Sequence, residues 1–221
     1  MKRSVISVAA AIAVAMLAVP ADAKTFRFAF QGDLNALDPY ALNETFTLGT
    51  LSNVMEGLVT RDKDLKIVPA LAERWEIVEP TRWRFHLRKG VKFHNGEDFT
   101  ADDVLFSFER ATSPESNIRT RFAAKLKAEK VDAHTVDFVL AVPNPILPAE
   151  WDSWFMMSKS WAEANAATKV QTKSNQLSPF ALKANGTGPF MVVSHEPGVR
   201  TTFQPNPAWW GKPQHNLTNV G

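Results

Sequence analysis

The 221-residue sequence contains no cysteine. Disulfide bonds, thiolate metal ligands and a thiol nucleophile are therefore excluded, and the folded chain has to be held together by its core. The composition supplies such a core, with 15 phenylalanines and 7 tryptophans. An excess of charge of one sign is also missing, because the formal net charge is only +2 and the basic residues are scattered among acidic ones. Nothing in this charge pattern indicates a nucleic-acid partner.

The sequence also lacks the residue patterns of common catalytic and cofactor sites. Its 5 histidines share no metal-ligand spacing, and neither His-Glu-x-x-His nor Gly-x-Ser-x-Gly occurs. Gly186-Thr187-Gly188 begins like a dinucleotide-binding loop, but Met191 stands at the third glycine position and Pro189 would interrupt the helix that such a loop requires. We therefore expect no cofactor, no metal and no catalytic residue, which is the profile of a binding protein rather than an enzyme.

Two polar features have both a functional and a structural interpretation. Asp102 and Asp103 are adjacent carboxylates, but neighbouring residues on a helix point in different directions, and Asp103 is placed to cap the helix. The structural interpretation is therefore preferred for both. His94, between Phe93 and Asn95, is expected to be a turn residue that makes local hydrogen bonds rather than a ligand or a base.

Two tryptophan pairs could contact a ligand through ring stacking. They are Trp151 with Trp154 and Trp209 with Trp210. Tryptophan is more often part of the core, so this interpretation is the less favoured one for the pairs. Trp154 is kept as a candidate ligand contact.

The first 23 residues are organised like a secretory signal peptide. Lys2 and Arg3 precede an apolar run from Val5 to Val19, which is shorter than the roughly 20 residues that cross a membrane. Ala21-Asp22-Ala23 supplies a small-x-small cleavage site, so we expect cleavage between Ala23 and Lys24. The sequence therefore predicts export.

Hydrophobic periodicity predicts a mixed α/β chain without internal repeats or a dividing linker. Strands are expected over 25–31, 58–60, 65–68, 74–78, 83–87, 127–131, 135–141, 190–194 and 200–204. Helices are expected from 44 to about 57, over 100–111, near 148–154 and over 159–166, with a loop over 169–185. Alternation places Phe26, Phe28 and Phe30 on one half-buried face of the first strand. Thr100 and Asp103 are expected to form a capping box at the start of the second helix.

Several segments occur in an order that resembles the family 5 extracellular solute-binding proteins. The longest runs from Trp83 to Phe108 and combines a strand, a basic turn, a short strand, a tight turn and a capped helix. The others are Leu37-Asp38-Pro39, Met55-Glu56-Gly57-Leu58, Pro69-Ala70-Leu71-Ala72-Glu73-Arg74-Trp75, Gly186-Thr187-Gly188-Pro189-Phe190 and Asn206-Pro207-Ala208-Trp209-Trp210-Gly211. Together these segments span essentially all of residues 24–213, with Met55 where the family commonly has an aromatic residue.

The resemblance implies the first lobe of a two-lobed periplasmic-binding-protein type II fold, mixed α+β and truncated. It implies that residues 24–221 form this lobe, that about 47–179 form a small subdomain, and that the second lobe is absent. The implied function is that of a periplasmic, monomeric solute-binding component of an ABC importer. Its partners would be a peptide or similar small solute, bound non-covalently between the lobes, and the permease subunits in the inner membrane. One alternative stays open, a truncated fragment without solute affinity that serves as a partly folded scaffold or decoy.

The resemblance also suggests ligand-binding residues. Peptide-binding relatives line their cleft with the segment that follows Leu-Asp-Pro, and the matching positions here are Asn43, Glu44, Thr45 and Phe46. The structural alternative is that Asn43 or Thr45 caps the helix that begins there.

Overall fold

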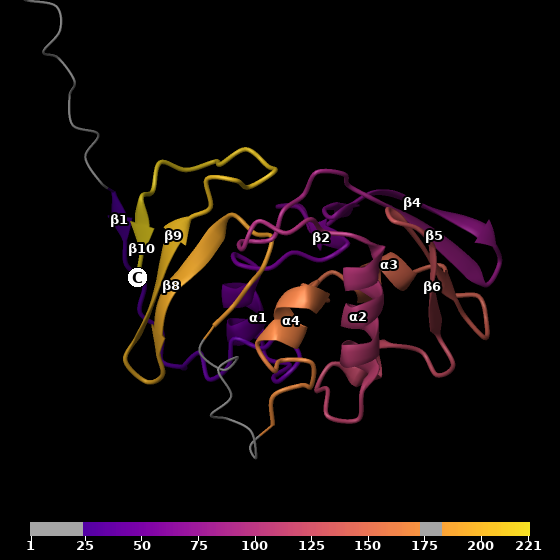
Figure 1. Cartoon of the computed structure of the whole chain (residues 1–221), viewed down its shortest axis with the longest axis horizontal. Coiled ribbons are helices and arrows are strands. Elements are labelled where there is room, and N and C mark those ends of the chain that lie inside the picture. The colour runs from indigo at the N-terminus through magenta and orange to yellow at the C-terminus, as the bar shows by residue number, and fades with distance from the viewer. Residues whose placement is uncertain (1–23, 173–182) are drawn as a thin grey trace, which may run out of the picture.

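A computed structural model describes residues 24–172 and 183–221. Figure 1 shows two four-stranded sheets at opposite ends of an elongated molecule, with the helices between them. The expected leader and its cleavage site, and most of the loop expected over 169–185, lie outside the described residues. The mixed α/β fold class is confirmed.

The right-hand sheet in Figure 1 is built from local hairpins and is antiparallel throughout. Its strands, in spatial order, are β4 (Ala72–Glu79), β5 (Arg82–Leu87), β7 (Thr135–Val139) and β6 (Lys127–Asp132). In β5 the side chains of Trp83, Phe85 and Leu87 are buried while the alternate residues are partly exposed, as the period of two predicts. A two-stranded ribbon, β2 (Val59–Arg61) with β3 (Ile67–Pro69), precedes this sheet.

Helix α2 (Ala101–Thr112) packs against the right-hand sheet and begins as predicted. Thr100 is its N-cap residue and forms a capping box with Asp103, whose Oδ2 accepts the Thr100 backbone N–H at 2.9 Å. Asp103 Oδ1 accepts the backbone N–H of Lys159, and Asp102 pairs with Lys130 on the surface. Both carboxylates therefore have the structural roles that the sequence favoured.

The remaining helices are short and lie between the two sheets (Figure 1). They are α1 (Thr45–Leu51), the 3-10 turn η1 (Arg119–Arg121), α3 (Leu147–Glu150) and α4 (Lys159–Ala164). Aromatic rings fill the core beneath them. Trp151 lies 4.6 Å from Phe138 and 5.1 Å from Trp154, measured between ring centroids, and neither tryptophan has exposed surface.

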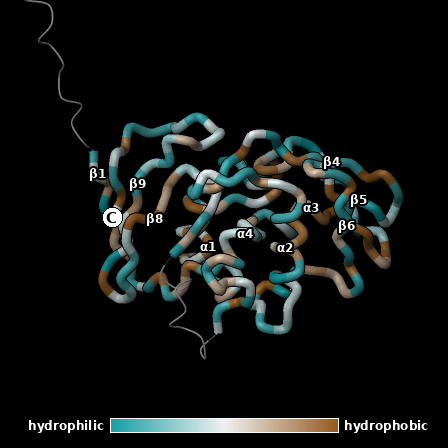
Figure 2. Tube along the Cα trace, viewed as in Figure 1, coloured by the Kyte–Doolittle hydropathy of each residue, from teal (hydrophilic) through white to brown (hydrophobic). Residues whose placement is uncertain are grey.

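The left-hand sheet joins the beginning of the described chain to its end (Figure 1). Its order is β1 (Thr25–Phe26), β10 (Asn219–Val220), β9 (Arg200–Pro205) and β8 (Phe190–Glu196), with β1 parallel to β10. The strand expected over 25–31 is thus confined to two residues. The prediction that one face of this strand is half-buried is also wrong, because Phe26, Phe28 and Phe30 are 51%, 60% and 51% exposed. Figure 2 shows hydrophobic residues on this sheet as well as in the middle of the molecule.

Helix α1 ends at Leu51, several residues before the end predicted near Gly57. The carbonyl oxygens of Asn53 and Val54 accept hydrogen bonds from the backbone N–H groups of Phe190 and Gly188, each at 2.9 Å. These long-range bonds hold residues after Leu51 against the turn at 186–188, so the chain leaves the helix early.

The glycines of the Gly186-Thr187-Gly188 turn allow this close approach. A Cβ on Gly186 would lie 1.9 Å from the carbonyl oxygen of Val54, and one on Gly188 would lie 2.7 Å from the Val54 carbonyl carbon. No other residue fits at either position without moving the backbone. The two glycines of Gly186-Thr187-Gly188 are therefore explained by the close packing of two backbone segments rather than by a phosphate-binding loop.

His94 also bonds to this turn, which corrects the expectation of local hydrogen bonds. Its Nε2 donates to the carbonyl oxygen of Gly188 at 3.1 Å, and its Nδ1 accepts the N–H of Gly186 at 3.3 Å. Burial lowers the pKa of the ring, which agrees with the neutral tautomer that this pair of bonds requires. His94 thus ties the Phe93–Asn95 turn to a segment some 90 residues later in the chain.

A fully buried ion pair joins three distant segments. Arg110 of α2 donates to both carboxylate oxygens of Asp38, at 2.7 and 2.6 Å, and both side chains are almost completely buried. Asp38 also accepts the backbone N–H groups of Tyr40 and Gln171, and Arg110 reaches the carbonyl oxygen of Lys169 at 2.7 Å. The pair therefore fixes the Leu37-Asp38-Pro39 turn against α2 and against the segment that follows α4.

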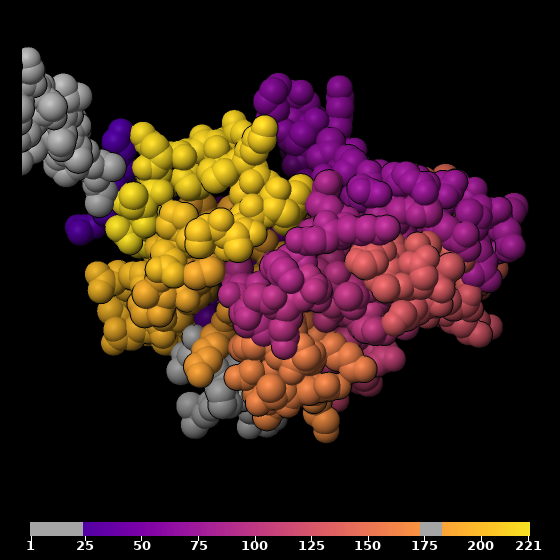
Figure 3. Space-filling model, turned by 45° about the horizontal axis from the view of Figure 1, so that its top comes forward, coloured from indigo at the N-terminus to yellow at the C-terminus, as the bar shows by residue number. Residues whose placement is uncertain are grey.

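Glu56 connects the two halves of the molecule in a similar way. Its carboxylate accepts the indole N–H groups of Trp209 and Trp210 at 3.1 and 2.9 Å and the hydroxyl of Thr187 at 2.8 Å. The guanidinium of Arg88 stacks 4.2 Å from the centre of the Trp210 ring. Figure 3 shows the yellow C-terminal residues lying against the magenta residues near 90. Burial raises the pKa of Glu56, although these hydrogen bonds and Arg88 oppose the shift.

We expect Asp38→Asn to lower the free energy of unfolding by about 3–5 kcal/mol, because it leaves a buried guanidinium without its anionic partner. Urea unfolding of the purified protein measures this loss. Asp64→Asn is the matched control, since Asp64 forms a surface ion pair with Lys63, and its cost should stay below about 0.5 kcal/mol. Equal losses in the two variants would show that the buried ion pair contributes no more to the free energy of unfolding than a surface pair does.

We expect the stability of the wild type relative to Glu56→Gln to fall as pH rises above the ordinary glutamate value of 4.5. A carboxyl whose folded-state pKa is raised binds its proton more tightly in the folded protein, so folding is penalised once the proton leaves. Urea unfolding across this pH range measures the difference. Glu115→Gln, on the surface, controls for removal of one carboxylate. A difference that does not change with pH would contradict the expected linkage.

Candidate functional site

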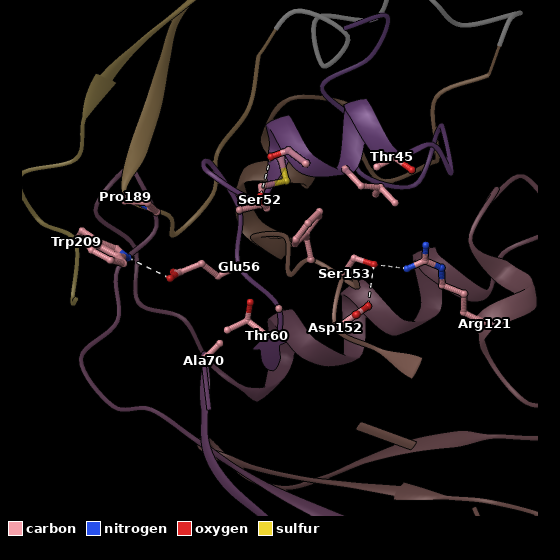
Figure 4. Close-up of a pocket in the computed structure, with 15 residues that line it drawn as sticks. Thr45, Ser52, Glu56, Thr60, Ala70, Arg121, Asp152, Ser153, Pro189 and Trp209 are labelled. Carbon is pink, nitrogen blue, oxygen red and sulfur yellow. Dashed lines mark hydrogen bonds between the residues drawn. The ribbon is translucent and has the colours of Figure 1, made fainter. Parts of the chain in front are cut away.

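A hollow of about 520 Å³ lies beside α1. We call it the α1 groove. Its lining comes from α1, from residues 52–57, from the β2–β3 ribbon, from residues 152–155 and from the C-terminal part of the chain (Figure 4). The lining residues are Thr45, Leu48, Gly49, Ser52, Met55, Glu56, Gly57, Thr60, Ala70, Arg121, Asp152, Ser153, Phe155, Pro189 and Trp209.

The four adjacent residues suggested by the family resemblance lie at the start of α1 but face different surroundings. Thr45 is exposed and lines both the α1 groove and a second hollow described below. Asn43 is exposed and its side-chain oxygen accepts a hydrogen bond from Arg121. Glu44 is the N-cap residue of α1 and its carboxylate accepts the Thr47 hydroxyl. No side-chain cap bond forms at this N-terminus, so the alternative that Asn43 or Thr45 caps the helix is wrong.

A continuous series of polar contacts runs along one side of the α1 groove (Figure 4). Arg61 Nε donates to Asp152 Oδ2, and the Ser153 hydroxyl donates to Asp152 Oδ1 at 3.2 Å. The same hydroxyl accepts a hydrogen bond from Arg121, which also donates to Asn43 at 2.6 Å. The series therefore contains two arginines and one carboxylate, and Asp152 is already paired with Arg61.

The opposite side of the α1 groove is formed by Glu56 and Trp209 (Figure 4). The hydrogen bond between them holds the Trp209 ring in position, and Met55 and Phe155 add apolar surface. Few polar groups among apolar walls are typical of sites that bind small molecules.

A second hollow, of about 820 Å³, lies on the other side of α1 beside the left-hand sheet. Phe46, the fourth suggested residue, lines it and stacks on Phe30 with 4.5 Å between ring centroids. Phe26 and Phe28 lie on the same surface. Three charged side chains line the α1 groove, those of Glu56, Arg121 and Asp152, against Asp33 and Arg200 in the second hollow. We therefore take the α1 groove as the better candidate for a site that recognises functional groups.

Trp154 is not at either hollow. Its side chain has 0% exposure and packs against Phe122, with 5.1 Å between ring centroids, and against Trp151. It has no exposed surface with which to contact a solute. Trp154 is therefore a core residue, which was the favoured interpretation of the tryptophan pairs. Trp151 shares that position, whereas Trp209 lines the α1 groove.

The described residues provide neither a metal centre nor a membrane-spanning helix. Nowhere in 24–172 and 183–221 do three or more histidine or acidic side chains gather as metal ligands would. The helices of the same ranges are all too short or too polar to cross a bilayer.

Sequence reasoning missed most of the groove residues. Arg121, Asp152 and Ser153 belong to no recognisable motif, and they meet only because η1 and the segment after α3 fold against the start of α1. Glu56 did carry a signal, since it belongs to the Met-Glu-Gly-Leu segment. Its position in the wall of a hollow required the structure.

Comparison with known proteins gives a consistent result. A family model described as bacterial extracellular solute-binding proteins, family 5 Middle, matches residues 66–220. The dipeptide-binding protein of Escherichia coli K12 is 30% identical over 90% of this chain, which spans 41% of that relative's length.

Solved structures agree with this match. The periplasmic binding protein DppA from Helicobacter pylori, in complex with the peptide STSA, is 26% identical with a TM-score of 0.72 and covers 90% of this chain and 42% of its own. The AgaA binding protein of A. tumefaciens R10, in complex with agropinic acid, is 26% identical with a TM-score of 0.76 and covers 89% of this chain and 39% of its own. With a family model that covers more than half of its residues, this chain belongs to the family 5 bacterial extracellular solute-binding proteins.

Proposed function

We propose that this chain acts as the periplasmic solute-binding component of an ABC importer and that its solute is a peptide. The α1 groove is the observation that carries the proposal, because it combines apolar walls with a few fixed polar groups next to the segment suggested for ligand contact. The names of the relatives support a peptide, since the E. coli protein is a dipeptide-binding protein and the H. pylori structure holds a peptide.

The proposed binding is non-covalent, with the α1 groove as the first lobe's wall of a cleft between two lobes. An extended peptide offers backbone N–H and C=O groups, which the hydroxyl of Thr45 can meet while side chains contact Met55 and Phe155. Delivery to permease subunits in the inner membrane, as a monomer, completes the proposal. The alternative from the sequence, a fragment without solute affinity, makes the opposite prediction for binding.

Alanyl-alanine should raise the melting temperature of the protein in a concentration-dependent way. A ligand that binds only the folded state stabilises it by about 2.7 kcal/mol at a hundred times its dissociation constant. Differential scanning calorimetry with increasing dipeptide measures the shift, and glucose at equal concentrations is the control. An unchanged midpoint at all dipeptide concentrations would favour the fragment without affinity.

Thr45→Val should weaken dipeptide binding roughly 2- to 10-fold, because it removes one hydroxyl contact without changing the size of the side chain. Thr50→Val is the matched control, since Thr45 and Thr50 both line the second hollow but only Thr45 also lines the α1 groove. Isothermal titration calorimetry compares the two variants. If both lose affinity equally, the α1 groove is not where the dipeptide binds.

A further inference from the structure

We infer that Arg121 is the residue in the α1 groove that binds a carboxylate group of the solute. This inference rests on the proposed solute-binding function and adds to it the chemical class of the solute, which is a carboxylate-bearing molecule held by that group.

The bonding of Arg121 is the first argument. Its guanidinium donates to two neutral acceptors, the side-chain oxygen of Asn43 at 2.6 Å and the hydroxyl of Ser153. Within residues 24–172 and 183–221 it forms no ion pair at 4.0 Å or less. Three other buried or half-buried arginines do form ion pairs, since Arg110 pairs with Asp38, and Arg82 and Arg84 pair with Asp137. Arg88 is half-buried without such a pair, but its guanidinium stacks on the Trp210 ring.

The geometry of Arg121 is the second argument. It is the last residue of η1, is partly buried, and its guanidinium points toward Ser153 at the edge of the groove (Figure 4). Its contacts to Asn43 and Ser153 anchor the planar group on two sides, so less side-chain entropy is lost when a ligand arrives. A guanidinium carries five N–H donors in a fixed fork, and the donors that remain match the two oxygens of a carboxylate.

The local charge balance is the third argument. Arg121 bonds to Asn43 and Ser153, and Asp152 is the one carboxylate among the described residues with a hydrogen bond to any of these three side chains. Its Oδ2 is held by Arg61. One positive charge is therefore left over on this side of the groove. Glu56, the other acidic residue in the lining, lies on the opposite side in Figure 4, beside Trp209. A solute carboxylate would thus be favoured at Arg121 and disfavoured at Glu56.

The test compares two ligands that differ only in this group. Alanyl-alanine has a C-terminal carboxylate and alanyl-alanine amide does not. Isothermal titration calorimetry should show that the wild type prefers the acid by about tenfold or more, as expected when charge-assisted hydrogen bonds are lost. In Arg121→Gln the preference should disappear, and in Arg121→Lys part of it should remain because the charge is kept.

Arg119→Gln is the matched control. Arg119 lies in the same turn, is exposed, and does not line the α1 groove, so this variant removes the same charge from the surface. It should keep the wild-type preference for the acid. A purely structural role for Arg121 would weaken the acid and the amide alike, so the ratio of their affinities separates recognition from misfolding.

A second measurement separates this inference from the peptide proposal. N-acetylalanine carries a carboxylate without an amino group, and its binding is followed through the 15N signal of the Arg121 guanidinium. If N-acetylalanine shifts that signal while neither dipeptide binds, carboxylate recognition stands and the peptide proposal fails. If the dipeptide acid and amide bind equally well, the inference fails and the peptide proposal stands. If none of these ligands depends on Arg121, the inference is overturned.

Discussion

The buried pair of Asp38 and Arg110 determines where the wall of the α1 groove lies. Because Asp38 accepts the backbone N–H of Tyr40, the pair fixes the Tyr40 side chain, whose hydroxyl donates to the carbonyl oxygen of Phe155 at 2.6 Å. The Tyr40 carbonyl accepts the N–H of Asn117, just before η1. Through Tyr40, the buried carboxylate of Asp38 therefore positions both the start of η1 and the segment that carries Ser153 and Phe155. Breaking a buried ion pair is costly because it leaves an unpaired charge in the core, so these segments are held firmly in place.

The right-hand sheet and helix α2 could be predicted because their causes are local. The alternation of Trp83, Phe85 and Leu87 with polar residues identifies a strand, and Thr100 with Asp103 identifies a helix start. The same reasoning failed for residues 25–31 and for the end of α1. In both places the outcome depends on partners far away in the chain, namely β10 in one case and Gly188 with Phe190 in the other.

Some residues of the candidate site could likewise be predicted from the sequence and others could not. The position of Asn43 and Thr45 followed from the resemblance around Leu37-Asp38-Pro39, and both lie at or beside the groove. Arg121 and Ser153 could not be found in this way, since neither residue type nor spacing distinguishes them from other surface residues. Trp154 shows the reverse error, because an aromatic residue suitable for stacking on a ligand is equally suitable for a core.

The parallel pairing of β1 with β10 has a consequence for the order in which the chain folds. Thr25 pairs with Asn219, so this part of the left-hand sheet closes a far longer loop than the hairpins β4–β5 and β6–β7 of the right-hand sheet do. Local contacts form quickly and distant ones pay a larger entropy of loop closure. The hairpins β4–β5 and β6–β7 can therefore assemble first, whereas Thr25 pairs only when the segment almost two hundred residues later in the chain is in place.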